Sequence, residues 1–106
     1  KYYIKGDDTR SFCYIDDAIK MTQAAIDNVE NCIINIGRQE ETQISTVAKL
    51  IMRFMNIDPA NLQIFEGPTG SVTRRCPDIS KIKRFSGFNN YTSLELGIKK
   101  TVESLL

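Results

Sequence analysis

The sequence contains no histidine, and this absence removes several kinds of chemistry at once. Ser-His and Cys-His nucleophile activation both need an imidazole base, and histidine is also the commonest metal ligand. Neither a G-x-G-x-x-G nor a G-x-x-x-x-G-K-[ST] pattern occurs. The glycine pair of "GPTG", residues 67–70, encloses a proline and predicts a turn rather than a phosphate loop. We therefore expect neither a catalytic residue nor a metal site in this chain.

Cysteine, net charge and long apolar runs are also scarce. Cys13, Cys32 and Cys76 are odd in number and far apart, which fits neither a disulfide framework nor a CxxC metal site, so we expect reduced, buried thiols. A formal net charge of +1 at pH 7 does not indicate the positively charged surface that nucleic-acid binding needs. No stretch reaches the roughly 18 to 20 apolar residues of a membrane-spanning helix, and "KYYIKGDDTR" lacks the apolar core of a signal peptide. These features predict a cytoplasmic protein that binds neither nucleic acid nor membrane.

What the chain does contain suits one small α/β domain. Its 106 residues, 42% of them hydrophobic and 25% charged, are enough for a single domain over residues 1–106. Short strand-like runs alternate with amphipathic stretches. This order is typical of an α/β fold with a small, partly parallel sheet and flanking helices.

Four runs predict strands, and two of them lie near the N-terminus. The runs "YYI" and "SFCYI" flank the polar "KGDDTR" and indicate a β-hairpin. The nearly continuous apolar run "NCIINIG", residues 31–37, predicts an interior strand covered on both faces. "NLQIF", residues 61–65, predicts a further strand.

Helical periodicity follows the second and third of these runs. Asp16 or Asp17 would cap a helix that ends near Asp27, with Asp16 as the preferred cap. A second amphipathic helix follows Ser45 and stops before Pro59. Their expected buried residues are Ile19, Thr22, Ala25 and Ile26 on the first, and Val47, Leu50, Ile51, Phe54 and Met55 on the second.

Two more helices are predicted in the C-terminal third. Residues 79–86 make two turns that end at Gly87, a typical C′ residue. The last helix starts at a Thr92 or Ser93 cap, and Thr92 with Glu95 has capping-box spacing. Its expected buried residues are Leu94, Ile98, Val102 and Leu105.

Four segments, in this order and at these spacings, carry a family resemblance. They are "GDDTRSFCYIDDAIKM", "INIGRQEETQIS", "RRCPDISKIKRFSGF" and "SLELGIKKTVESLL". Together they resemble the C-terminal, substrate-binding part of the extended short-chain dehydrogenase/reductases that act on nucleotide sugars. These are NAD-dependent epimerases, dehydratases and decarboxylases of UDP-, dTDP- and related sugars. The resemblance covers nearly the whole chain and implies the C-terminal part of a Rossmann-type fold.

The resemblance also implies what this chain does not carry. In the family, the N-terminal half holds the glycine-rich NAD loop and a Tyr-x-x-x-Lys pair that transfers protons and hydride. No tyrosine of this sequence has a lysine four residues on. We therefore expect a part that binds a nucleotide-diphosphate sugar but is inactive and free of cofactor alone. Its missing partner is the N-terminal half with NAD, and the parent enzyme can be a homodimer.

Arg10 is the first candidate binding residue. A guanidinium is always charged and presents paired donors that match phosphate oxygens. The sequence by itself favours a surface cation paired with Asp7 or Asp8, whereas the resemblance places Arg10 at the diphosphate of the sugar nucleotide. Tyr14 has two readings as well: a phenol donor near the substrate, or an aromatic side chain packed in the core.

The second basic element is "RRCPD", residues 74–78. The resemblance implies that an arginine here reaches the nucleotide phosphates or ribose, and that Asp78 fixes the loop before the next helix. Adjacent residues of an extended segment point to opposite sides, so only one of Arg74 and Arg75 can face the ligand, and we choose Arg75. Two other functions stay open. One is a stand-alone module that binds a phosphorylated ligand or partner, and the other is an interaction domain that uses exposed helix faces.

Overall fold

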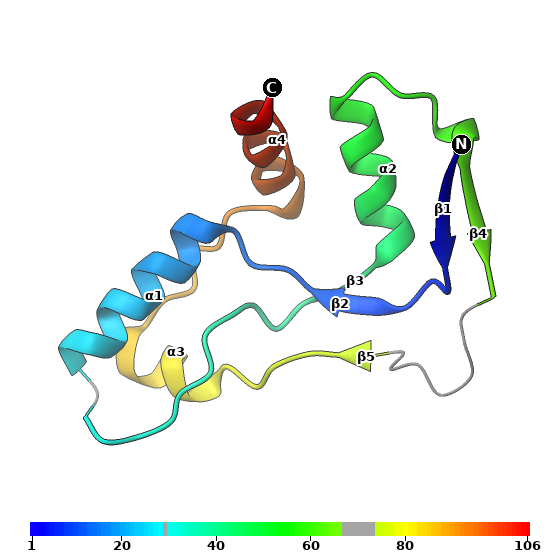
Figure 1. The fold of residues 1–106 in the computed structure, drawn as a ribbon. Coiled ribbons are helices and arrows are strands. Elements are labelled where there is room, and N and C mark those ends of the chain that lie inside the picture. Colours follow the sequence, from blue (N-terminus) through cyan, green and yellow to red (C-terminus); the bar gives the residue numbers. More distant parts are fainter. Residues whose placement is uncertain (29, 67–73) are drawn as a thin grey trace.

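The computed structural model describes residues 1–28, 30–66 and 74–106, and only the backbone of residues 74 and 75. Strands and helices alternate along the chain, as Figure 1 shows. Their order is β1 (Tyr2–Lys5), β2 (Thr9–Ser11), α1 (Ile15–Asn28), β3 (Glu41–Gln43), α2 (Ile44–Phe54), the 3-10 helix η1 (Pro59–Asn61), β4 (Leu62–Phe65), β5 (Arg74–Arg75), α3 (Ser80–Ser86) and α4 (Leu94–Leu105).

The described strands form two small sheets. In the first, β1 pairs with β4 in parallel, with Tyr2 opposite Leu62. In the second, β2 lies between β3, which is antiparallel to it, and β5, which is parallel. Helices lie within both connections between parallel partners, because parallel strands need a long crossover. The predicted α/β class with a partly parallel sheet is confirmed.

The predicted β-hairpin is wrong, because β1 and β2 belong to different sheets. The turn between them binds the start of α2 instead. The Asp7 carboxylate accepts hydrogen bonds from the Ser45 N–H at 3.0 Å and from the Ser45 hydroxyl at 2.8 Å. The Ile44 N–H donates to the Asp8 carbonyl at 3.0 Å. These bonds direct β2 away from β1 and toward partners that are distant in the sequence.

The interior strand predicted over residues 31–37 is also wrong. Residues 32–36 belong to neither of the described sheets, and Ile33 is 90% exposed. Ile34 and Ile36 do pack against the hydrophobic core, while the Ile33 carbonyl accepts a hydrogen bond from Lys81 Nζ at 2.9 Å. The run is therefore covered on one side only, whereas an interior strand needs neighbours on both faces.

The hydrophobic core lies between α1 and α3. Met21, Ile79 and Ile82 are almost completely buried there, with Phe88 and Tyr91 packed around them. On α1 the buried residues are Asp17 and Met21, so the expected burial of Ile19, Thr22 and Ile26 is wrong, and all three lie exposed. The helix also begins at Ile15, which places Asp16 and Asp17 inside its first turn rather than at the cap.

The predicted ends of α3 and α4 agree in most respects with the structure. Gly87 ends α3 with a left-handed backbone (φ +66°), as a C′ glycine should. Ser93 caps α4, because its hydroxyl accepts the Leu96 N–H at 3.2 Å. The capping box is wrong, since Thr92 lies before the cap and Glu95 pairs with Arg53. Burial was overestimated for Leu105, which is 80% exposed.

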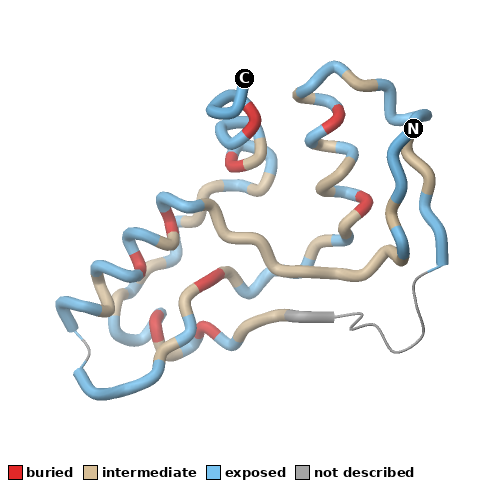
Figure 2. Tube along the Cα trace, viewed as in Figure 1, coloured by how far each residue is buried: buried red, intermediate tan, exposed pale blue. Residues whose placement is uncertain are grey.

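The chain folds into a thin slab rather than a sphere. Its radius of gyration is 16.2 Å, against about 13 Å for a compact domain of this length, and its thinnest dimension is 18 Å. Buried residues are correspondingly few and scattered in Figure 2. All three cysteines are free, but Cys32 is exposed, which corrects the expectation of three buried thiols. Within the described ranges, no helix is long and apolar enough to cross a bilayer.

Candidate functional site

Arg10 lies in the middle of β2, the central strand of the three-stranded sheet. Its side chain is 29% exposed, and its Nη2 lies 3.8 Å from Asp8 Oδ2. Nη1 donates a hydrogen bond to the Thr9 carbonyl at 2.7 Å. Asp7 is held by Ser45, so of the two aspartates weighed as partners, Asp8 is the one in ion-pair distance. A single 3.8 Å ion pair near the surface contributes little to stability.

The register of β2 and β5 brings the two basic segments together. Arg10 is directly opposite Arg75, and Thr9 is opposite Arg74. Residues opposite one another on neighbouring strands lie on the same face of a sheet, and adjacent residues lie on opposite faces. Position 75 therefore shares a face with position 10. The side chains of both β5 arginines lie outside the described residues, so their roles remain predictions.

Tyr14 lies beside α4. The position of a β-carbon added to Gly97 would be 3.4 Å from the Tyr14 Cβ, and Lys100 Nζ lies 5.6 Å from the centre of the ring. A β-carbon at residue 97 would therefore be in van der Waals contact with Tyr14. These contacts fit the alternative in which Tyr14 is a packed aromatic side chain. Its role as a hydrogen-bond donor to the substrate stays a prediction.

Asp78 organises the start of α3. Its Oδ1 accepts hydrogen bonds from the Ser80 N–H at 2.9 Å and the Ser80 hydroxyl at 2.7 Å, and its carbonyl accepts one from Asn35 Nδ2 at 3.2 Å. The two bonds from Ser80 lower the pKa of the Asp78 carboxyl. The side chain is exposed and fixes the loop that follows β5. A contact between Asp78 and substrate remains a prediction.

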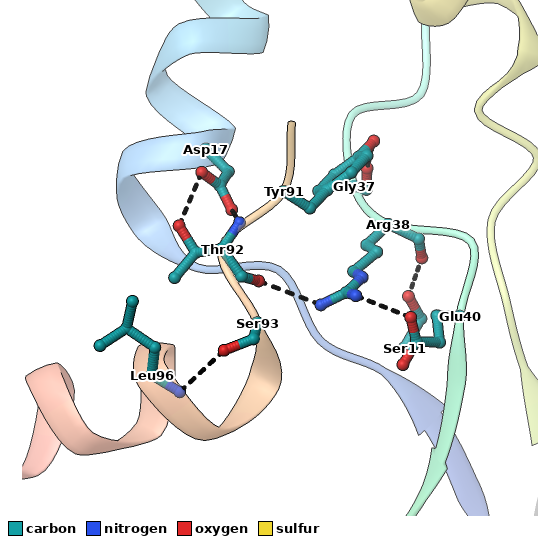
Figure 3. Close-up of polar contacts among 9 residues, drawn as sticks. All are labelled: Ser11, Asp17, Gly37, Arg38, Glu40, Tyr91, Thr92, Ser93 and Leu96. Carbon is teal, nitrogen blue, oxygen red and sulfur yellow. Dashed lines mark hydrogen bonds and ion pairs between the residues drawn. The ribbon is translucent and has the colours of Figure 1, made fainter. Parts of the chain in front are cut away.

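A polar network, not expected from the sequence, joins β2 to the start of α4 (Figure 3). Asp17 is 2% exposed and accepts hydrogen bonds from the Thr92 N–H at 2.8 Å and the Thr92 hydroxyl at 3.1 Å. Arg38 Nη1 donates to the Thr92 carbonyl at 3.1 Å, and Nη2 pairs with Glu40 at 2.7 Å. The Ser11 hydroxyl donates to the Arg38 carbonyl. The residue after Arg10 is thus tied through Arg38 to the peptide unit before α4.

Two groups beside this network have perturbed ionisation. Burial raises the pKa of the Tyr91 phenol, with smaller contributions in the same direction from Cys13 and Asp17. The Tyr91 hydroxyl donates to the Gly37 carbonyl at 2.8 Å. Burial also raises the pKa of the Cys13 thiol, so this thiol stays protonated at neutral pH and is a poor nucleophile. Among the residues that the structure describes, no cluster of three or more potential metal ligands is present.

An apolar groove lies between α2 and α4. Its volume is about 400 Å³. Its lining is largely aliphatic and aromatic, with Arg38 and Thr92 among its few polar members. Tyr14 belongs to this lining. The groove and the basic strand pair β2·β5 are thus built from different parts of the chain.

Comparison with known proteins finds relatives that match nearly the whole chain. The chain is 36% identical over 95% of its length to the UDP-N-acetyl-alpha-D-glucosaminuronate decarboxylase of Bacillus cytotoxicus. It corresponds to a part of an extended short-chain dehydrogenase/reductase. The match covers 33% of that decarboxylase, so the chain spans about a third of its length. No family model matches the chain.

Solved structures agree with this assignment. UDP-glucose 4-epimerase of Thermotoga maritima, solved with UDP-glucose, aligns with a TM-score of 0.84 at 27% identity, over 99% of this chain and 34% of the epimerase. UDP-glucuronic acid 4-epimerase of Bacillus cereus, solved with UDP-glucuronic acid and NAD, aligns with a TM-score of 0.75 at 28% identity, over 98% and 35%. The resemblance inferred from the motifs and the Rossmann-type assignment of the fold are both confirmed.

Proposed function

We propose that residues 1–106 are the sugar-nucleotide-binding part of an NAD-dependent epimerase, dehydratase or decarboxylase, with a UDP- or dTDP-sugar as ligand. The observation that carries the proposal is the register of β2 and β5, which sets Arg10 opposite Arg75. The relatives support it, because their names specify UDP-sugars and one of the solved structures holds NAD beside its UDP-sugar.

A diphosphate suits this pair of positions. Its two phosphates carry several acceptor oxygens and more than one negative charge, so two arginines on neighbouring strands can each bind one phosphate. Strands about 4.8 Å apart give a spacing on the scale of adjacent phosphates. Asp8 is then one partner of Arg10 that the ligand replaces, and the polar network around Arg38 holds β2 in position.

The remaining steps of the reaction belong to the part of the parent enzyme outside this chain. We assign NAD binding and the Tyr-x-x-x-Lys pair to that part, and we expect these 106 residues alone neither to bind NAD nor to turn over a nucleotide sugar. The thin slab, with its exposed apolar side chains, favours this division over a stand-alone binding module. The cytoplasmic location, the homodimeric parent and the single domain over residues 1–106 remain predictions.

The experiment is a titration of UDP into variants of the full-length enzyme by calorimetry at one ionic strength. Arg10→Ala should cost about 2 to 4 kcal/mol of affinity, because it removes a charge-assisted contact. Arg10→Lys should recover only part of this loss, since an ammonium lacks the paired donors of a guanidinium. The affinity for NAD should stay unchanged in both.

Matched arginines provide the controls. Arg75→Ala should weaken UDP binding more than Arg74→Ala, since only position 75 shares the face of Arg10. Arg84→Ala removes an arginine on α3 that stacks on Phe85, and it should leave the affinity unchanged. An Arg10→Ala enzyme that binds UDP and dTDP as tightly as the unmodified enzyme would refute the phosphate role.

A further inference from the structure

The pairing between β2 and β3 is short, and Arg10 lies at its centre. Three residue pairs form it, and Arg10 opposite Thr42 is the middle pair. On its other side β2 has two pairs with β5. Strand pairings this short contribute little stability by themselves. The position of the Arg10 backbone therefore depends on the contacts that fix the two ends of the β2–β3 pairing.

Contacts from outside the sheet fix each of these ends. At one end, the Asp7 carboxylate just before β2 accepts both bonds from Ser45, just after β3. At the other end, Ser11 is opposite Glu41, and the Ser11 hydroxyl donates to the Arg38 carbonyl. The second end therefore stays in place only if the backbone at Arg38 stays in place.

The Arg38 side chain has three contacts that hold this backbone (Figure 3). Nη1 donates to the Thr92 carbonyl at 3.1 Å, Nη2 pairs with Glu40 at 2.7 Å, and the guanidinium carbon lies 5.6 Å from the centre of the Tyr91 ring. Glu40 directly precedes β3, so Arg38 connects the start of that strand to the peptide unit before α4. The side chain is 20% exposed, and a guanidinium with two polar partners and a ring beside it has little freedom to move.

We infer that Arg38 is a positioning residue for the phosphate site. Its side chain fixes the end of β2 and the start of β3, and this fixes the place from which Arg10 reaches the ligand. Arg38 acts through Arg10, since both of its terminal nitrogens already have partners in Thr92 and Glu40. The inference rests on the proposed function, under which Arg10 binds a phosphate. A binding group must be held within about 0.5 Å of its productive position, because charge-assisted hydrogen bonds depend on distance and angle.

A double-mutant cycle in the full-length enzyme tests the inference. UDP is titrated by calorimetry into the unmodified enzyme, Arg10→Ala, Arg38→Ala and the variant that carries both changes. We expect Arg38→Ala to weaken UDP binding about five- to ten-fold when Arg10 is present, and by less than about two-fold when Arg10 is replaced, because its effect passes through Arg10. A merely structural role would change the affinity by the same factor in both backgrounds, or would only reduce the fraction of enzyme that binds. The affinity for NAD should not change.

Arg53 provides a matched control, because it makes the same kinds of contact away from β2. It pairs with Glu95 of α4 and lies 5.0 Å from the centre of the Phe54 ring. Arg53→Ala should leave the UDP affinity unchanged within about two-fold. Arg38→Lys keeps the charge but lacks the paired donors, so its effect should be smaller than that of Arg38→Ala. If Arg38→Ala does not fold, Arg38→Lys and Glu40→Gln take its place in the cycle.

Two results would overturn the inference. One is a loss of UDP affinity from Arg38→Ala that is equal with and without Arg10, or absent from both. The other is a loss from Arg53→Ala as large as that from Arg38→Ala. An Arg10→Ala enzyme that binds UDP as tightly as the unmodified enzyme would instead refute the proposed function, so the two failures are distinguishable.

Discussion

Replacing Asp17 should be among the most damaging single changes to this fold. Its carboxylate is almost fully buried and accepts both the N–H and the hydroxyl of Thr92. A hydrogen bond to a charged group contributes about 1.5 to 3 kcal/mol, and Asp17→Ala removes two while leaving two donors without their acceptor. We therefore expect a loss of about 3 to 4 kcal/mol in the free energy of unfolding. Asp17→Asn keeps one acceptor oxygen and should lose about half as much.

Urea denaturation followed by circular dichroism measures these losses, and two further variants make the result specific. Asp16→Ala removes the neighbouring, exposed carboxylate and should change stability by no more than about 0.5 kcal/mol. Thr92→Val removes only the hydroxyl bond and should cost about 1 kcal/mol. Amide exchange at Leu96, whose N–H is capped by Ser93, should accelerate in Asp17→Ala because the start of α4 loses its attachment. If Asp17→Ala is no less stable than Asp16→Ala, the reasoning is wrong.

Three further changes test other features. The lowered pKa of Asp78 means that its bonds from Ser80 stabilise the fold above the carboxyl's unfolded pKa of about 4 and are lost as the pH falls through the folded value. Asp78→Asn should therefore be less stable than the unmodified chain at pH 7, by a margin that closes in acid, as urea midpoints at several pH values would show. Gly87→Ala should cost about 1 kcal/mol in the same assay, since alanine is strained at a φ of +66°. The raised pKa of Tyr91 places its stabilising effect below the unfolded phenol pKa of about 10, and this effect is lost as the pH rises through the folded value. Tyr91→Phe should cost about 1 kcal/mol at neutral pH, through its bond to Gly37, and should flatten the alkaline loss of stability.

The sequence predicted best those features that depend on residues close together in the chain, such as helices and their caps. The helix α2, the serine cap of α4 and the glycine that ends α3 are each read within a few residues, and the structure confirms them. The predicted buried face of α2 is wrong in part, because Ile51 and Met55 are exposed and the buried residues are Ser45 and Met52. The hairpin and the interior strand failed because strand pairing depends on neighbours elsewhere in the chain. Turn composition predicts that the chain bends but does not specify which strand it meets next.

In the candidate site too, the sequence identified individual residues but not their partners from distant parts of the chain. Arg10 was found from its motif, and so was the pair of arginines in β5, but their register is a property of the sheet. The acceptors Asp7 and Asp17 were out of reach of sequence reasoning, because their donors lie 38 and 75 residues away. An aspartate beside a helix start is usually its local cap, and here that general rule gave the wrong partner.

The parallel strand pairs also determine when the basic site can form during synthesis. Residue 2 pairs with Leu62, and Arg10 pairs with Arg75. As these residues emerge from the ribosome, β1 and β2 are made before β4 and β5, and they remain without these parallel partners until α1 and α2 have been synthesised. Contacts this distant in sequence close slowly, because the entropy of a long loop is lost before any pairing is gained. The two arginines can therefore share a face only after α1 and α2 have been synthesised.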